Sequence, residues 1–284
     1  MIAGIDRIQV TTVDRRAAIE AWRRLFGAEV VREDRSPSLA AVRTVLRAGT
    51  SDVELLEPRG IGLAAQHAAR SRSALFAVGL EVDDLGAARA RLDALAVHHV
   101  VDGEQVRVNS DWLGVAGLRI VLSQKAERPP AGLLGHLYEV THLTAGYERA
   151  ARRLAQVFDL DPADFRPIRS EQYGYQGVLT LFDPERLDRI ESVTPLERRK
   201  TMGRFFHRQG PALYMAYAEA RDTAALRERL LEHAPGDWTG PRDGAAPDNL
   251  FVHPKALGGV LLGVSRESFA WSWSGAPARV RSAA

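Results

Sequence analysis

The sequence has 284 residues, of which 45% are hydrophobic and 26% are charged; this is typical of a globular protein with a full core and room for two domains. The chain has no cysteine, so disulfides and thiol chemistry are excluded. The net charge of +2 is nearly balanced and says little about partners, and a nucleic-acid surface would need basic residues clustered on one face, which the sequence does not indicate. No apolar run is long enough for a membrane span or a secretory leader, and we expect a cytoplasmic protein that binds neither nucleic acid nor membrane.

The first part of the chain alternates strand and helix patterns. Residues 5–13 alternate apolar and polar side chains, as a strand does. Asp14 and Gly27 are residue types that begin and end helices, and the apolar side chains between them have helical spacing. Further strand patterns cover residues 40–46 and 52–56. A second cycle follows, with strand 74–82, helix 85–94 and strands 97–101, 105–109 and 118–122.

The same cycle returns in the second part of the chain. Residues 124–133 are polar, contain a Pro pair and are the expected linker. The next predicted elements are strand 137–144, helix 147–158 and strands 177–182 and 189–193. Residues 74–81 align without gaps on residues 212–219, a repeat of about 130 residues that indicates duplicated domains. The prediction is an α+β protein with four βαβββ units in two domains, residues 1–123 and 134–267, and an aromatic tail, residues 268–284.

Three stretches of the second half carry a family resemblance: residues 188–196, 203–215 and 251–263. They are similar to methylmalonyl-CoA epimerase-like members of the vicinal oxygen chelate superfamily, the group of glyoxalases, bleomycin resistance proteins and type I extradiol dioxygenases. In the first domain, residues 52–58 and 81–85 match as well. The resemblance implies two tandem glyoxalase-like domains.

The resemblance also implies four inward-facing positions in each domain that typically hold a divalent metal through His, Gln or Glu, His and Glu. The metal then acts as a Lewis acid on two neighbouring substrate oxygens. In this chain the positions fall on Arg7, Glu54, Ala77 and Val121 in the first domain and on Glu139, Glu191, Met215 and Gly263 in the second. Since the last two positions of each set cannot bind a hard metal, we expect no metal in either domain. A metal bound by Glu191 with Glu139 or His142 is the less favoured alternative.

The candidate catalytic residues are Glu139, Glu191 and His253. The two glutamates are expected to project from neighbouring strands and to act as a general base, or as an acid–base pair whose repulsion raises one pKa. Alternatively, one or both pair with an arginine or lie in water. His253 precedes Pro254 and is either a catalytic imidazole or a strand-edge residue bonded to the backbone.

Five further residues are candidates for substrate binding: Tyr217, Met215, His142, Arg7 and Glu54. Met215 and Tyr217 alternate along a strand and would line an apolar cup, although core packing is the stronger expectation for Met215. Arg7 and Glu54 are expected to form a salt bridge in place of the lost metal, with anion binding by Arg7 as the alternative.

Two functions of different classes follow from the resemblance. The first is an enzyme of the isomerase, epimerase or lyase type that acts on a small carbonyl-containing molecule, such as an acyl-CoA or a polyketide-like acid, with a carboxylate base and without the metal quartet. The second is a non-catalytic protein that binds and sequesters a small molecule, as bleomycin resistance proteins do. An extradiol dioxygenase is less favoured because of Met215 and Gly263. The chain is expected to be a monomer or a homodimer.

Overall fold

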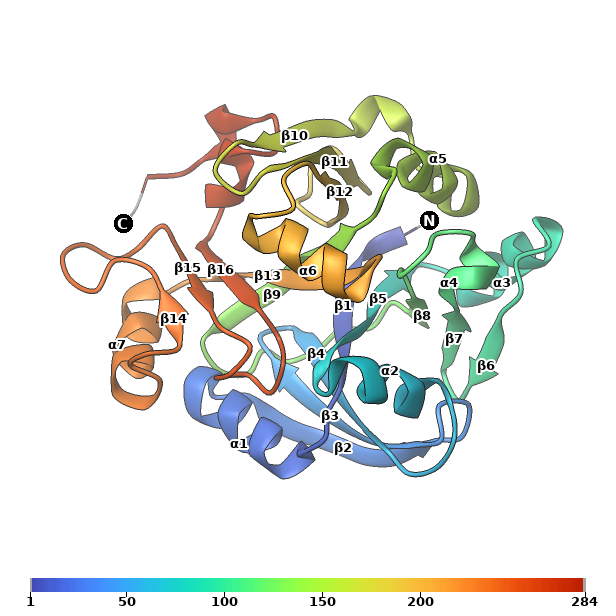
Figure 1. Ribbon diagram of the computed structural model, residues 1–284, viewed down its shortest axis with the longest axis horizontal. Helices are drawn as coiled ribbons and strands as arrows, with labels where there is room; N and C mark the ends of the chain where they lie inside the picture. Colours follow the sequence, from blue (N-terminus) through green and yellow to red (C-terminus); the bar gives the residue numbers. More distant parts are fainter. Residues whose placement is uncertain (1, 283–284) are drawn as a thin grey trace. The chain divides into compact units, whose positions relative to one another are not determined.

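The computed structural model describes residues 2–282 and contains four repeats of a strand, a helix and three strands (Figure 1). The predicted order of elements is therefore confirmed. The first repeat consists of β1 (Ile2–Thr11), α1 (Arg15–Phe26), β2 (Glu29–Ser36), β3 (Ala41–Ala48) and β4 (Ser51–Pro58). After α2 (Leu63–Ser71), the second consists of β5 (Ala74–Val82), α3 (Leu85–Ala94), β6 (Val100–Asp102), β7 (Gln105–Val108), α4 (Ser110–Leu113) and β8 (Ile120–Gln124).

The second half of the chain repeats this pattern. The third repeat consists of β9 (Leu134–Leu143), α5 (Tyr147–Phe158), η1 (Pro162–Asp164), β10 (Arg166–Ser170), β11 (Tyr175–Leu181) and β12 (Arg189–Pro195). After α6 (Thr201–Gln209), the fourth consists of β13 (Ala212–Ala220), α7 (Thr223–His233), β14 (Trp238–Thr239), β15 (Asn249–Val252) and β16 (Leu262–Arg266). The tail contains the short 3₁₀ helices η2 (Phe269–Ser272) and η3 (Pro277–Arg279).

The strands form two eight-stranded sheets of identical topology, β2-β3-β4-β1-β5-β8-β7-β6 and β10-β11-β12-β9-β13-β16-β15-β14. Within each repeat the first and last strands pair in parallel, as β1 does with β4 and β9 with β12. The remaining neighbours within a repeat are antiparallel. The first and last strands of each repeat therefore lie side by side near the middle of the sheet.

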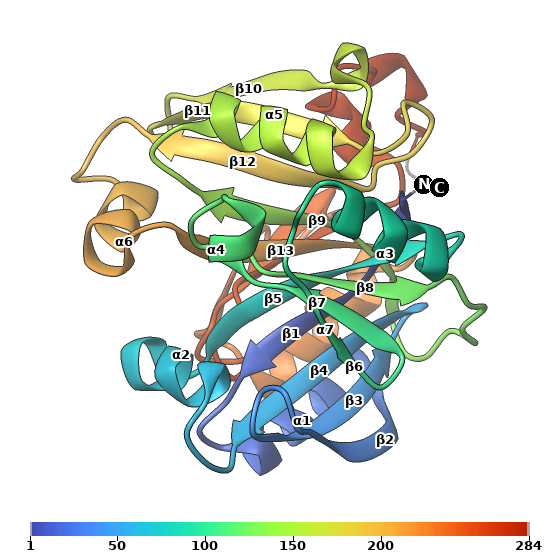
Figure 2. The ribbon, with the colours of Figure 1, turned by 90° about the vertical axis from the view of Figure 1, so that its right-hand side faces the viewer.

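Three of the four repeat helices, α1, α3 and α7, begin at an aspartate side chain that accepts a backbone hydrogen bond. Asp14 accepts from the Ala17 amide at 2.9 Å, and Asp84 and Asp222 accept equivalent bonds at the starts of α3 and α7. Gly27 closes α1 with a positive φ of 69°, which a residue without Cβ adopts at little cost. Figure 2 shows α5 lying along β11 and β12, which it contacts.

Packing divides the chain into two compact units that interleave the repeats. Unit 1 contains Met1–Ile5, Ala77–Ala126 and Glu139–Tyr214, and unit 2 contains Asp6–Phe76, Glu127–Tyr138 and Met215–Ala284. Each unit thus takes one repeat from each half of the chain. The division into residues 1–123 and 134–267 follows the two sheets, and its use as a domain boundary stays a prediction.

Several elements lack the patterns used for prediction. Strand β2 is an edge strand whose side chains are mostly exposed, so it shows no apolar alternation. Helices α2 and α6 come after the last strand of a repeat, where no helix was expected. The aromatic tail is not extended, because residues 269–272 form a 3₁₀ helix. Among residues 2–282, no helix is long and apolar enough to cross a membrane.

Candidate functional site

The parallel pair β1–β4 brings Arg7 and Glu54 together, as predicted. The register sets Arg7 opposite Asp52 and Gln9 opposite Glu54, so these side chains share one face of the sheet. Arg7 Nη1 donates to Glu54 Oε1 at 2.6 Å, and Gln9 Nε2 donates to Glu54 Oε2 at 2.6 Å. The expected salt bridge is confirmed, and Gln9 is an additional partner that the motifs did not reveal.

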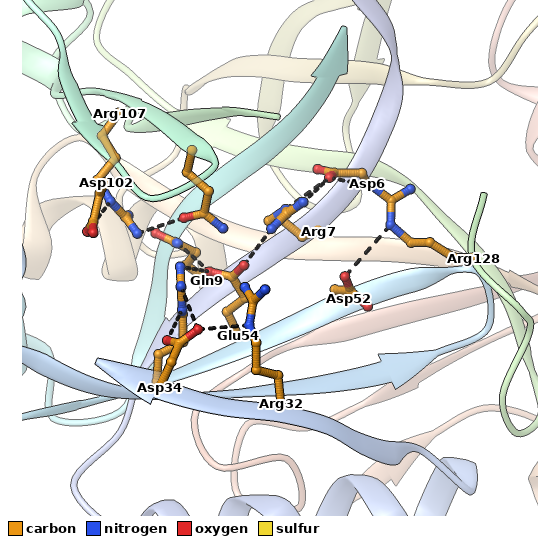
Figure 3. Close-up of polar contacts among 12 residues, drawn as sticks. Asp6, Arg7, Gln9, Arg32, Asp34, Asp52, Glu54, Asp102, Arg107 and Arg128 are labelled. Atoms are coloured by element: carbon orange, nitrogen blue, oxygen red, sulfur yellow. Dashed lines mark hydrogen bonds and ion pairs between the residues drawn. The ribbon is translucent and has the colours of Figure 1, made fainter. Parts of the chain in front are cut away.

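This pair is the centre of a larger ionic cluster, which we call the Arg7 network (Figure 3). Arg7 also bonds Asp6, and Arg128 bonds Asp6 at 2.9 Å. The members are Arg7, Arg43, Arg47 and Arg128 with Asp6, Asp34, Asp52 and Glu54, and the more exposed Arg32 joins through Asp34. Each carboxylate lies beside at least one guanidinium, so the buried charges are compensated.

The parallel pair β9–β12 places the two predicted glutamates on one face in the same register. Glu139 is opposite Arg189, and Thr141 is opposite Glu191. Arg189 Nε donates to Glu139 Oε2 at 2.7 Å, and the Thr141 hydroxyl donates to Glu191 Oε2 at 2.5 Å. We call Glu139, Thr141, Tyr175, Arg189 and Glu191 the Glu191 cluster. One of the alternatives considered for the glutamates, pairing with an arginine, therefore holds for Glu139.

The electrostatics of the cluster favour a proton on Glu191. Glu191 is 4% exposed, and burial, together with the nearby Glu139 carboxylate, raises its pKa to about 8. Burial also raises the pKa of Glu139, but the Arg189 guanidinium opposes this rise. Burial and the neighbouring Glu191 raise the pKa of Tyr175, so its hydroxyl stays a neutral partner for Glu191. The cluster holds two carboxyl groups and one guanidinium. Arg189 bonds Glu139, so the proton is more stable on Glu191, which Arg189 does not bond.

An apolar cluster continues the same sheet face beyond Glu191. Leu143 follows Thr141 by two residues and Val193 follows Glu191 by two, and both pack with Tyr175 and Met202. The partly buried side chains packed against this core are Ile168, Phe205, Phe206 and Tyr214. Tyr175 belongs to both groups, since its ring is in the apolar cluster and its hydroxyl reaches Glu191. A carboxyl group that is mostly protonated at neutral pH thus borders an apolar surface beside α6.

Two predicted histidines lie outside the Glu191 cluster. Adjacent strand residues point to opposite faces, so His142 is turned away from Thr141 and Glu191. Its Nε2 bonds the Ala116 carbonyl at 2.8 Å, and burial lowers its pKa to about 4. His253 bonds the Thr239 hydroxyl through Nε2 at 2.8 Å and belongs to unit 2, whereas the Glu191 cluster belongs to unit 1.

Met215 and Tyr217 lie on β13 in unit 2. Met215 is 4% exposed, which fits the expected core role. Tyr217 is opposite Gly263 on β16, and a Cβ added to Gly263 would lie 2.2 Å from the Tyr217 ring. The ring occupies the space that a side chain at this position would need. Its aromatic neighbours are Tyr138, Phe251 and Trp273, at centroid distances of 5.8 to 6.0 Å.

The residues at the family's metal positions do not fit a divalent ion. A guanidinium occupies the first ligand position of β1 and bonds the retained Glu54 directly. In β13 and β16 the corresponding residues are Met215 and Gly263, and the Tyr217 ring covers the latter. No group of three or more His, Cys, Asp or Glu suited to a metal occurs in residues 2–282.

Arg189, Thr141 and Tyr175 were missed as site residues. Strand alternation is the signal that could have found the first two, because each lies two residues from a predicted glutamate on the same face. Tyr175 begins β11, and only the antiparallel pairing with β12 brings its strand beside Glu191.

The class of protein follows from the sheets and from the strand pairs that carry Glu54 and Glu191: this is a tandem vicinal oxygen chelate fold. The family model of the Glyoxalase/Bleomycin resistance protein/Dioxygenase superfamily matches residues 4–104 of this chain. No curated protein matches the sequence.

Solved structures agree with this fold. A triple mutant of 4-hydroxymandelate synthase from Streptomyces coelicolor is 13% identical, with 94% of this chain and 93% of that chain covered and a TM-score of 0.66. A xylose isomerase-like TIM barrel/4-hydroxyphenylpyruvate dioxygenase fusion protein is 12% identical, with 99% and 53% covered and a TM-score of 0.63. Methylmalonyl-CoA epimerase from Mycobacterium tuberculosis is 22% identical over 47% of this chain and 89% of its own, with a TM-score of 0.39. At these identities the first two structures show the fold alone.

Proposed function

We propose that this protein binds a small carbonyl-containing molecule, such as an acyl thioester, beside Glu191 and exchanges a proton at the carbon next to the carbonyl. The Glu191 carboxylate takes the C–H proton, and the electron pair of that bond forms the enolate. Return of a proton from the resulting carboxylic acid to the same face of this carbon exchanges its hydrogen with solvent. Delivery to the opposite face, after the enolate has turned, gives the epimer. The neutral Tyr175 hydroxyl, which bonds Glu191, is the donor that we assign to the developing enolate oxygen.

The observation that carries this proposal is the burial of Glu191 beside the Glu139 carboxylate, which raises the pKa of Glu191 to about 8. A general base works best when its pKa is close to the working pH, because it is then both available and strong enough. Thr141 holds the Glu191 carboxyl in place through a 2.5 Å hydrogen bond.

Deuterium exchange tests the proposal without knowledge of the product. Propionyl-CoA and methylmalonyl-CoA would be incubated with the protein in heavy water, and label at the carbon next to the carbonyl followed by mass spectrometry. We expect exchange that rises with pH to a plateau above about pH 8, as Glu191 loses its proton. Glu191→Gln should slow exchange by at least about 100-fold, whereas Glu20→Gln, on the exposed face of α1, should not.

The alternative is a binder without turnover, and the apolar surface around Phe205, Phe206 and Tyr214 favours it. Under this alternative the thioesters bind but no label enters, and Glu191→Gln leaves their affinity unchanged. Exchange that is equal in the parent protein and Glu191→Gln would remove Glu191 from the mechanism altogether.

A further inference from the structure

The segment around α6 is strongly basic and exposed. Between residues 198 and 208 the chain has six basic side chains and no acidic one: Arg198, Arg199, Lys200, Arg204, His207 and Arg208. All except the partly buried Lys200 are exposed. We call these six residues the basic α6 patch.

The four arginines of the patch form no ion pair with any carboxylate in the part of the chain that the structure describes. Arg198 bonds the His207 ring, and Arg204 bonds the Arg199 carbonyl and the Thr201 hydroxyl. The Arg208 guanidinium lies 5.9 Å from the centre of the Phe205 ring. The positive charge of these four arginines is therefore not neutralised by a carboxylate of the described residues, in contrast to the Arg7 network.

The backbone beneath the patch is held firmly. Gly203 packs so closely on the preceding turn that an added Cβ would lie 2.1 Å from the Glu197 carbonyl oxygen. Lys200 Nζ pairs with Glu197 at 2.6 Å and also bonds the Glu171 carbonyl. The Leu196 amide bonds the Gly174 carbonyl at 2.8 Å. The arginine side chains thus extend from a fixed platform.

The same helix forms the edge of the apolar cluster beside Glu191. Phe205, Phe206 and Tyr214 are only partly buried and leave apolar surface next to the arginines. Beneath them, Tyr175 connects the cluster to Glu191. Unit 1 therefore contains the basic α6 patch, the apolar side chains beside it and Glu191, which Tyr175 connects to the apolar cluster.

We propose that the basic α6 patch binds the anionic head group of the ligand, whose apolar body lies against Phe205, Phe206 and Tyr214. The ligand class is an amphipathic oxyanion, with a phosphate or carboxylate head. The assignment of its carbonyl end to Glu191 rests on the proposed function, but head-group binding does not. An exposed cation–anion contact is weak singly and screened by salt, so several arginines would share the head group.

Calorimetry on the Glu191→Gln full-length protein tests binding separately from turnover. Three probes are compared. Hexanoyl-coenzyme A carries phosphates, hexanoate carries a carboxylate, and the N-acetylcysteamine thioester of hexanoic acid is neutral. We expect at least one anionic probe to bind about tenfold more tightly than the neutral thioester. The additional substitutions Arg199→Gln and Arg208→Gln should remove this advantage, as should high salt. The matched control is Arg149→Gln with Arg152→Gln on exposed positions of α5, which should not.

The outcomes separate the sources of the anion. Tight binding of hexanoyl-coenzyme A alone assigns a phosphate head, and tight binding of hexanoate assigns a carboxylate head. The proposal is overturned if the neutral thioester binds as well as both anions, or if the α5 control loses as much affinity as the α6 variant. It is equally overturned if a single-stranded oligonucleotide binds through Arg199 and Arg208 while no acyl probe does. Charge-dependent binding without deuterium exchange would reject only the proposed function.

Discussion

The Arg7 network and the Glu191 cluster occupy equivalent positions on two sheets of the same topology, yet their charges are arranged oppositely. Arg7 on β1 faces Asp52 on β4, whereas Glu139 on β9 faces Arg189 on β12. Two residues further along, each pair of strands keeps a glutamate with a hydrogen-bond donor opposite it. That donor is Gln9 for Glu54 and Thr141 for Glu191.

The difference shows how the equivalent glutamates Glu54 and Glu191 differ in protonation because their neighbours differ. Glu54 touches a guanidinium, so it is part of a compensated ionic structure. In the Glu191 cluster the only guanidinium is bonded to Glu139, and Glu191 is left with hydroxyl partners. A proton replaces the missing cation, and the group becomes able to exchange it near neutral pH.

The largest effect on the free energy of unfolding should come from removal of the central arginine. The loss should be larger for Arg189 in the Glu191 cluster than for Arg7 in the Arg7 network. Arg189→Met leaves two buried carboxyl groups without a cation, and we expect the free energy of unfolding to fall by about 3–5 kcal/mol. Arg7→Met should cost about 2 kcal/mol, because Gln9 and Arg43 remain beside Glu54. Urea unfolding measures both losses.

A double substitution supplies the control for this pair. Glu139→Gln with Arg189→Met removes both charges and should recover part of the stability lost in Arg189→Met alone. If Arg7→Met proved the more destabilising single variant, the contrast between the two sites would be wrong.

The second largest effect is expected in the pH dependence of the free energy of unfolding, which the raised pKa of Glu191 should change. The folded protein keeps a proton on Glu191 up to about pH 8, against an ordinary pKa of 4.5 in the unfolded chain. This contribution to stability is fully present below about pH 4.5 and is lost as the pH rises through about 8. The loss is at most about 1.4 kcal/mol per pH unit within this window. Unfolding of the parent and of Glu191→Gln across this range should show this additional fall in stability with pH only in the parent. Parallel curves would mean that the pKa of Glu191 is not raised.

The fourth repeat should tolerate a small addition poorly. Tyr217 faces Gly263, whereas the equivalent pair of the second repeat is Gly79 opposite Val121, so the large and small residues have exchanged strands. We expect Gly263→Ala to lower the free energy of unfolding by about 1–3 kcal/mol, because its Cβ would collide with the ring. In a Tyr217→Ala background the same change should cost much less. An equal cost in both backgrounds would show that the ring is not the obstacle.

Metal removal should have the smallest effect. Since neither site offers a ligand set, elemental analysis of protein purified without chelators should find less than one equivalent of divalent metal per chain. Chelator should leave the thermal midpoint unchanged within about 1 °C. A stoichiometric metal, with a lower midpoint after chelation, would require a different ligand set.

The sequence predicted the parts of this comparison that depend on repeats and alternation. The repeated order of strands and helices, the facing of Arg7 and Glu54, and the shared face of Glu139 and Glu191 all follow from motifs and a period of two. The fold follows to the same extent, apart from α2, α4, α6 and the edge strands β2, β10 and β14. These elements lack an apolar alternation or lie where the repeat has no helix.

The missing parts depend on side chains that meet across long separations in the chain. Arg189 reaches Glu139, 50 residues away, through a register that no local pattern specifies. Gly263 was read as the loss of a carboxylate, but its contact shows that the space belongs to the Tyr217 ring. Tyr175 joins Glu191 to the apolar cluster only because β11 pairs with β12.

The interleaving of repeats also bears on the order in which the chain can fold during synthesis. Unit 1 is complete once residue 214 has left the ribosome, whereas unit 2 joins residues 6–76 to the segment from Met215 onward. The first repeat must therefore wait for the last before its packing is finished. Contacts of such long range make folding slow, and the apolar faces of the early strands are exposed in the meantime.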